Sequence, residues 1–441
     1  MKEPLISVGI VTSSIIEIKL IGEYYLKSKD LYFLHKLIFR NSQNGILLES
    51  SLGTYYVNES DVFVPFPPNN ASFIVKSAKI GNNFHWERKT DNRYIGSFKI
   101  IREKGKLTLV NYISLENYIQ SVIRSEINEN AHIELLKAQA IVARSWTLAQ
   151  LKREKRKSLY ERRNKGEIIR WYERDGHINF NFCNDDHCQR YHGIGKSPSL
   201  NVMRAVEETR GLALFGPNGV CDARYSKSCG GKTELFENTW GIDETGCTQS
   251  IEDSDYPLEL GGEDLSIERN AKKWILSRPD AFCNVTDNEI LKTNLVDFDN
   301  ETKDFFRWKI EYSQEEISEI IKEKLNRNYG AILDLIPVER GASGRLIKLK
   351  IVGQKHTMII GKELEIRRAL SKTHLYSSAI IIEKQNIVDG IPQKFVLHGA
   401  GWGHGVGMCQ IGAAAMAVNG YAFDEILAQY FPNSKIKRYY K

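Results

Sequence analysis

Short runs of aliphatic and aromatic residues, separated by clusters of Asn, Ser and Gly, fill most of the first 112 residues of the chain. Runs of this length between turn-forming residues are typical of β-strands. The pattern predicts strands at residues 5–11, 15–20, 31–39, 46–48 and 107–110. Pro65, Pro67 and Pro68 are expected to break any strand or helix that reaches them.

A helical period replaces this pattern near residue 115. Leu115, Tyr118, Ile119 and Val122 recur at the i, i+3 and i+4 spacing of one helix face. The Ala-rich stretch that follows favours a second helix over about 132–150, and an extension into the basic run after it stays open.

Further elements are predicted in the C-terminal two thirds of the chain. The pattern indicates helices at 200–209, 410–417 and 423–431, a strand at 211–215, and a half-buried strand in the alternating run GRLIKLKIVG. Segregated strands at the N-terminus and a helix pair in the middle predict an α+β fold.

Composition narrows the class of protein. The 441 residues are 26% charged and 42% hydrophobic, which excludes a mainly disordered or fibrous chain and suggests two to four structural units, or one domain with large insertions. No run of 18 apolar residues occurs, so we expect no transmembrane segment. The first residues, MKEPLISVGIVTSS, do not resemble a signal peptide, and we expect that any leader of an exported form precedes this numbering.

The net charge of +6 is concentrated in one segment. Residues 152–174 contain ten basic and four acidic residues, so the rest of the chain is neutral on balance. Such a run is either a solvated helix face or a local binding patch. No base-stacking or groove-reading motif accompanies it, so we expect no nucleic-acid partner.

The segment DGHINFNFCNDDHCQRYHG contains five possible metal ligands within sixteen residues. Cys and His in a short irregular loop suit tetrahedral zinc. The preferred ligands are His177, Cys183, His187 and Cys188, with His192 as the alternative to His187. Four protein ligands would make the zinc structural, whereas a position left to water would make it catalytic. The competing interpretation is a disulfide or free thiols with solvated histidines.

An acidic residue, Glu126, lies between the two central helices, and the second helix presents Lys137, Gln139 and Arg144 after it. A carboxyl group in an enclosed apolar pocket has a raised pKa and can donate a proton near neutral pH. The alternative is a carboxylate at the N-terminus of a helix or an ordinary surface residue.

Two glycine-containing segments offer possible ligand contacts. ARYSKSCGGKTE supplies the hydroxyl groups of Tyr225 and Ser228 beside a Gly-Gly turn, and HGAGWGHGVGMCQ brackets Trp402 and His404 with glycines. Both are equally compatible with simple packed turns. The second segment lacks the dinucleotide and phosphate-binding patterns. Cys409 has no identifiable general base, so we expect it to be a buried thiol.

Four blocks, taken in order, resemble the SpoIID/LytB family of stage II sporulation protein D and the amidase enhancers. They are SVIRSEI with LLKAQAIVARSW, CNDDHCQ, ARYSKSCGGKTE, and GAGWGHGVGMCQIGAAAMAVNGYAFDEIL, and they span about 115–245 and 340–440. The resemblance implies a lytic transglycosylase that cleaves the MurNAc-β-1,4-GlcNAc bond of peptide-stripped peptidoglycan strands and leaves 1,6-anhydro-MurNAc ends. It implies that Glu126 is the catalytic acid/base, although Ile127-Asn128 replaces the family's usual Met-Pro. It also implies a structural zinc in the region 177–188.

The resemblance further implies a glycan-binding groove. We expect it to be lined by residues that bind N-acetyl and hydroxyl groups: Lys137, Gln139, Arg144, Tyr225, Ser228, Trp402 and His404. The groove is expected between a helical catalytic subdomain and β-rich flanking lobes. The expected domains are a β-rich N-terminal region at 1–105 and a catalytic domain at 106–441, with an inserted α/β segment at about 250–395.

Two other functions stay open at this point. One is a non-catalytic glycan-binding protein that enhances a cell-wall amidase, and the other is a zinc-dependent hydrolase with an open metal site. In each case the expected location is the cell envelope.

Overall fold

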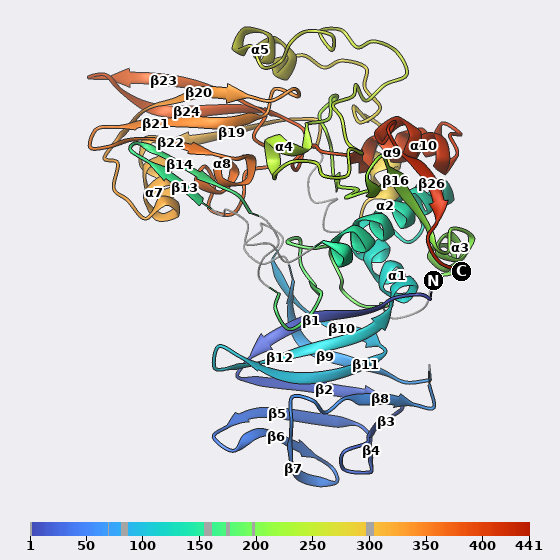
Figure 1. Cartoon of the computed structure of the whole chain (residues 1–441). Helices are drawn as coiled ribbons and strands as arrows, with labels where there is room; N and C mark the ends of the chain where they lie inside the picture. The colour runs from blue at the N-terminus through green and yellow to red at the C-terminus, as the bar shows by residue number, and fades with distance from the viewer. Residues whose placement is uncertain are drawn as a thin grey trace. The chain divides into compact units, whose positions relative to one another are not determined.

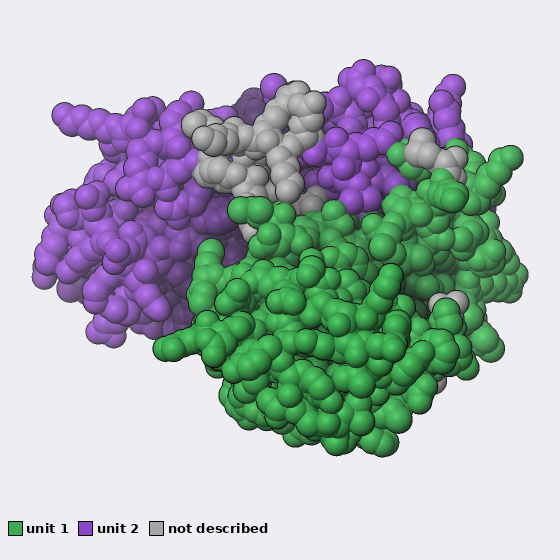
Figure 2. Space-filling view, turned by 60° about the horizontal axis from the view of Figure 1, so that its bottom comes forward, with its two compact units in different colours: residues 1–130, 174–212, 438–441 green, residues 131–173, 213–437 purple. Residues whose placement is uncertain are grey.

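The computed structural model describes residues 2–68, 70–80, 87–153, 161–172, 177–195, 199–296 and 304–441 (Figure 1). The chain forms two compact units, shown in two colours in Figure 2. Unit 1 comprises Met1–Asn130, Arg174–Leu212 and Arg438–Lys441, and unit 2 comprises Ala131–Glu173 and Ala213–Lys437. Both units contain helices and strands, so the predicted α+β class is confirmed. The expected domain boundary near residue 105 stays a prediction.

Unit 1 is built on two sheets. The strand order is β15-β1-β12-β11-β8-β3-β4 in the first and β10-β9-β2-β5-β6-β7 in the second. The bounds are β1 Leu5–Ser13, β2 Ile15–Ile21, β3 Glu23–Leu26, β4 Leu31–Phe33, β5 Lys36–Ser42, β6 Gly45–Ser50, β7 Gly53–Val57, β8 Phe63–Phe66, β9 Ser72–Ile80, β10 Arg88–Ile95, β11 Ser97–Glu103, β12 Lys106–Ser114 and β15 Phe182–Cys183.

Aromatic side chains fill the core of unit 1. Phe63 stacks on Phe98 with ring centroids 4.9 Å apart, and Phe73 contacts Phe98 at 4.8 Å. Alternate residues of β2, including Ile16 and Ile18, are buried because successive side chains of a strand point to opposite faces of the sheet.

Two strand predictions in unit 1 need correction. The expected strand at 31–39 is split into β4 and β5, with His35 between them at φ 66°, outside the extended region. Pro65 does not break β8 but lies inside it, opposite Tyr24 of β3. The pairing of β8 with β11 is at Phe63, so Pro65 lies beyond it and needs no N–H toward that strand.

The predicted helices are confirmed as α1 (Leu115–Glu126), α2 (Ile133–Lys152) and α3 (Leu200–Glu208). In unit 1, α1 packs against α3. In unit 2, α2 is buried on nearly all sides, which its small Ala138, Ala140 and Ala143 side chains permit.

In its described part, the basic run is not helical beyond Lys152. Its described part forms β13 (Glu161–Asn164) and β14 (Glu167–Arg170), while residues 154–160 and 173–174 lie outside the described residues. Arg170 of β14 bonds to the Glu161 carboxylate at 2.6 Å and to Glu365 at 3.1 Å. One ion pair within the sheet and one to the helix α8 (Glu363–Ala369) therefore hold β14 in place.

Unit 2 contains a five-stranded sheet, β13-β14-β22-β21-β20, and a three-stranded sheet, β19-β24-β23. Residues from both sheets and from α7 and α8 share one apolar core, which includes Trp308, Ile321, Leu349, Ile366 and Leu397. The predicted alternating strand is confirmed as β21 (Leu346–Gly353).

The remaining bounds complete the fold. They are β16 Leu212–Gly216, β17 Gly219–Val220, β18 Tyr225–Ser226, β19 Arg307–Ser313, β20 Ile332–Arg340, β22 Thr357–Gly361, β23 Ile380–Val388, β24 Ile391–Ala400, β25 Met408–Cys409, β26 Lys435–Arg438, α4 Phe236–Thr239, α5 Glu268–Leu276, α6 Asn288–Asn294, α7 Gln314–Leu325, α8 Glu363–Ala369, α9 Gln410–Val418 and α10 Phe423–Tyr430. The strand and the two helices predicted at 211–215, 410–417 and 423–431 are confirmed as β16, α9 and α10.

Candidate functional site

Glu126 is the last residue of α1 and is only 7% exposed. Its Oε1 accepts a hydrogen bond from the backbone N–H of Arg190 at 3.2 Å, and its Oε2 lies 3.8 Å from the Arg190 Nε. Arg190 also donates to the Asp186 carboxylate at 2.8 Å. Glu126 is therefore a buried helix-end carboxylate beside a cation, rather than an ordinary surface residue.

Asp186 and Arg190 were not predicted as site residues. Burial raises the pKa of Asp186 to about 7. The positive charge of Arg190 lowers this pKa, whereas the negative charges of Asp185 and Glu126 raise it further. Unit 1 thus holds a second carboxyl group in the electrostatic environment of Glu126. The acidic pair within CNDDHCQ was the only sequence signal for it.

The four preferred metal ligands of unit 1 come together. The candidate ligand atoms of His177, Cys183, His187 and Cys188 all lie within 4.8 Å of one another. The Cys188 sulfur is 3.5 Å from His177 Nε2 and 3.7 Å from His187 Nδ1, and the Cys183 sulfur is 3.9 Å from His187 Nδ1. Tetrahedral zinc would place S and N ligands about 3.6 Å apart, so the donor set fits zinc.

His192, the alternative fourth ligand, lies outside this group. Burial lowers the pKa of His192 to about 3, so its ring is neutral. Its backbone N–H donates to the Ser125 hydroxyl at 3.0 Å.

The Cys/His segment is hydrogen-bonded along the C-terminal part of α1. Besides the bonds to Glu126 and Ser125, the Ser121 hydroxyl donates to the carbonyl of Gly193 at 2.8 Å. A metal bound by this segment would therefore stiffen the loop that donates directly to Glu126.

In unit 2, the two glycine-containing segments meet. Tyr225 of β18 pairs with Met408 of β25, and Ser228 and Trp402 exchange two backbone hydrogen bonds of 3.0 and 2.8 Å. Gly230, at φ 80°, permits this approach, because a Cβ there would lie 2.8 Å from the backbone nitrogen of Gly401.

The aromatic residues of these segments already have neighbours. The Trp402 ring stacks on Tyr376 with centroids 3.8 Å apart, so one of its faces is covered. His404 contacts the Trp240 ring at 4.7 Å, and its Nδ1 accepts a hydrogen bond from the Val406 N–H at 3.0 Å. Burial holds the pKa of His404 well below its ordinary value, so the imidazole is neutral.

The predicted groove residues of α2 lie in different environments. Lys137 pairs with Glu134 at 2.9 Å. Gln139 is fully buried and accepts a hydrogen bond from Gln410 at 3.3 Å, and Arg144 is fully buried as well. Ser228 is also inaccessible. A direct sugar contact by these three buried side chains would require them to become accessible, and their binding role stays a prediction.

Residues 103–215 match the family described as stage II sporulation protein, and this range contains Glu126 and the Cys/His segment. The predicted resemblance to the SpoIID/LytB family is thus confirmed for this part of the chain. Residues 234–407 match a second family, described as a domain of unknown function (DUF8618). The match to the stage II sporulation protein family supports a cell-wall-related role for the chain.

Two relatives extend this result. An uncharacterized protein of Brachyspira hyodysenteriae is 24% identical over 346 residues, which cover 78% of this chain and 73% of the relative. The amidase enhancer of Bacillus subtilis is 24% identical over 258 residues, which cover 56% of this chain but 34% of the enhancer. The match thus spans about a third of the enhancer's length. None of the helices in the described part of this chain has the length and apolar character needed to cross a bilayer.

Proposed function

We propose that this SpoIID/LytB protein is a peptidoglycan lytic transglycosylase that uses Glu126 as its acid/base. The observation that carries the proposal is the environment of Glu126, a buried carboxylate held at the end of α1 by the backbone of Arg190. The substrate is a glycan strand stripped of stem peptides, and the bond cleaved is MurNAc-β-1,4-GlcNAc.

The reaction needs one acid/base group rather than the two carboxylates of a typical glycosidase. Glu126 protonates the bridging oxygen as its bond to C1 of MurNAc breaks, and the resulting carboxylate accepts the proton of the 6-hydroxyl group. The 6-oxygen of the same sugar bonds to C1, which closes the 1,6-anhydro ring without water. Because the nucleophile belongs to the substrate, its high effective molarity replaces a protein nucleophile.

The Cys/His cluster is proposed to bind a structural zinc ion that holds the loop beside Glu126. His177, Cys183, His187 and Cys188 would fill a tetrahedral shell, and a bound zinc would crosslink the loop. The loop in turn carries the Arg190 N–H to Glu126. A catalytic zinc would need a position left open by the protein, which four ligands do not leave, so this donor set disfavours a zinc-dependent hydrolase.

Glycan binding is assigned to the remaining predicted residues. Tyr225, Trp402 and His404 are partly exposed and offer a hydroxyl group, an indole and a neutral imidazole for hydroxyl and N-acetyl groups. Lys137 is proposed to contact the glycan beside them. Gln139, Arg144 and Ser228 are fully buried, so their proposed binding role requires that they become accessible.

The alternative function is a non-catalytic enhancer of a cell-wall amidase, and a relative named amidase enhancer favours it. Both functions belong to the cell envelope outside the cytoplasm. The disulfide between Cys221 and Cys247 agrees with that location, because such bonds persist in oxidising compartments.

The deciding experiment incubates denuded glycan strands with the protein and detects anhydro ends by mass spectrometry. Glu126→Gln should keep the fold and lose the product, whereas the nearby Glu129→Gln, whose partner is Arg124, should retain it. Turnover by Glu126→Gln would remove this residue from the mechanism. A wild-type protein that forms no anhydro ends but accelerates an added amidase would establish the enhancer function instead.

A further inference from the structure

Three cysteines and one aspartate from distant parts of the sequence meet in the interior of unit 2. Cys229, Asp253, Cys283 and Cys409 are all buried, and their candidate ligand atoms lie within 4.8 Å of one another. The sulfur atoms of Cys229 and Cys283 are 3.7 Å apart. Two thiolates on one tetrahedral zinc ion would be about 3.8 Å apart, so this spacing already suits a shared metal.

Backbone donors support an ionised sulfur at Cys409. Its Sγ accepts hydrogen bonds from the N–H groups of Cys229 at 3.2 Å and of Gly412 at 3.4 Å. Cys409 is also the N-cap residue of α9, where the positive end of the helix dipole favours a thiolate.

Asp253 is oriented toward the cluster by two fixed donors. Its Oδ2 accepts a hydrogen bond from the Cys283 N–H at 2.9 Å, and its Oδ1 accepts one from the Tyr430 hydroxyl at 2.6 Å. Outer hydrogen bonds of this kind orient the ligands of metal sites. Gly412 leaves room for the arrangement, since a Cβ there would lie 2.3 Å from the Tyr430 oxygen and 2.5 Å from Asp253.

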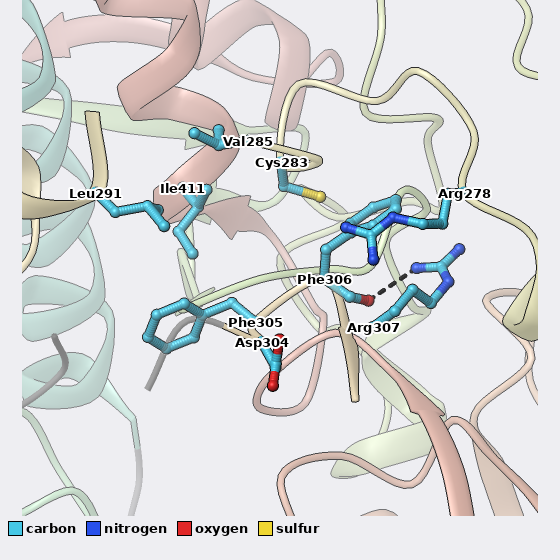
Figure 3. Close-up of a pocket in the computed structure, with 9 residues that line it drawn as sticks. All are labelled: Arg278, Cys283, Val285, Leu291, Asp304, Phe305, Phe306, Arg307 and Ile411. Carbon is cyan, nitrogen blue, oxygen red and sulfur yellow. Dashed lines mark hydrogen bonds between the residues drawn. The ribbon is translucent and has the colours of Figure 1, made fainter. Parts of the chain in front are cut away.

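Two guanidinium groups lie beside the cluster. Arg345 is 1% exposed and donates to the Cys229 carbonyl at 3.0 Å. Arg307 donates to the carbonyl of Gly230, the residue after Cys229, at 3.0 Å, and lines a small pocket together with Cys283 (Figure 3). A zinc ion with three thiolates and one carboxylate carries a net charge of about −2, which two adjacent cations offset.

We propose that Cys229, Asp253, Cys283 and Cys409 form a second, structural zinc site of the Cys₃Asp type. Three thiolates favour a soft or borderline metal over magnesium and calcium, and the carboxylate favours zinc over Cu(I). The site joins the Gly-Gly segment, the segments around 253 and 283, and the glycine-rich loop. It shares no residue with the Cys/His cluster of unit 1 and does not depend on the proposed transglycosylase activity.

Zinc content of the purified full chain, measured by elemental mass spectrometry, tests the site. The wild type should hold about two zinc ions per chain, and the double variant Cys183→Ser, Cys188→Ser about one. The matched double variant Cys229→Ser, Cys283→Ser should also hold about one if it folds. The Cys183→Ser, Cys188→Ser variant (the unit 1 variant) leaves the buried cluster intact. Its zinc content therefore decides whether the second site exists, even if the Cys229→Ser, Cys283→Ser variant does not fold.

A folded Cys183→Ser, Cys188→Ser variant without zinc would overturn the second site, and so would a Cys229–Cys283 disulfide in non-reducing peptide mass spectrometry. If the wild type holds one zinc ion and the unit 1 variant also holds one, the buried site is supported and the structural zinc proposed beside Glu126 is contradicted. Cobalt substitution adds an independent readout. In the unit 1 variant background, Cys409→Ser should weaken the thiolate-to-cobalt charge-transfer band by roughly a third.

Discussion

The two cysteine clusters of this chain contain similar candidate metal ligands but are assembled in different ways. The unit 1 cluster comes from residues 177–188, its side chains are partly exposed, and its segment borders Glu126. The unit 2 cluster comes from residues 229–409 and is completely buried. A local, partly exposed cluster can stiffen one loop, whereas a buried cluster of distant residues holds several segments together. The first should therefore affect activity most, and the second should affect stability most.

The largest effect is expected from removing Asp253. In Asp253→Ala, the Tyr430 hydroxyl and the Cys283 N–H lose their buried acceptor, and the proposed zinc loses a ligand. We expect a loss of about 3–5 kcal/mol in the free energy of unfolding, measured by denaturant titration. Asp280→Ala, on an exposed side chain, is the control. A loss below about 1 kcal/mol would show that Asp253 does not hold the segments together.

Cys183→Ser should separate activity from stability. Loss of this ligand loosens the loop that donates to Glu126, so we expect release of anhydro ends to fall about 10–100-fold. Hydrogen exchange should rise over residues 188–193 without a matching change in unit 2. An unchanged rate of product formation would mean that the loop positions Glu126 without a metal.

Gly412→Ala should show how tightly unit 2 is packed around its cluster. The added Cβ would clash with the Tyr430 oxygen and the Asp253 carboxylate, and we expect a loss of about 1–3 kcal/mol in thermal or denaturant unfolding. Gly262→Ala is a matched control, because nothing lies within 4 Å of its Cβ position. Equal stability of the two variants would contradict the close packing.

The smallest effect concerns His404 and is expected only in acid. Burial holds its folded-state pKa well below the ordinary 6.5, so below pH 6.5 the unfolded chain binds a proton that the folded chain does not. Stability should therefore fall as the pH drops below 6.5, by at most about 1.4 kcal/mol per pH unit from this group. His404→Gln should reduce that slope relative to the exposed control His356→Gln in unfolding titrations at pH 5–7. Parallel slopes would contradict the lowered pKa of His404 in the folded chain.

Elements with a clear period were the predictable part of the fold. The i, i+3, i+4 pattern predicted α1, and the Leu-Lys alternation predicted β21. Short strands such as β3 and β7 were missed because a few residues carry too little periodicity. One alternative for the basic run was a solvated helix face, but its described residues 161–170 pair as β13 and β14, which shows that tertiary pairing overrides local composition.

The residues of the candidate sites were also predictable only in part. The ligand set at 177–188 was predictable because its members are close in the chain, but the contribution of Asp186 and Arg190 to the Glu126 environment was not. The full burial of Gln139 and Arg144 was also not predictable, since an Ala-rich helix can face solvent or protein. Cys409 was correctly expected to be buried, yet its neighbours Cys229 and Cys283 were not foreseen.

Taken alone, the amino-acid sequence determined the family resemblance, the main helices and the local Cys/His cluster, because each depends on residues at short, regular spacing along one segment. Only the tertiary structure decided that Cys229, Asp253, Cys283 and Cys409 lie together and that Arg190 reaches Glu126. Contacts between residues so far apart depend on loop closure and packing over the whole unit, which no local pattern encodes.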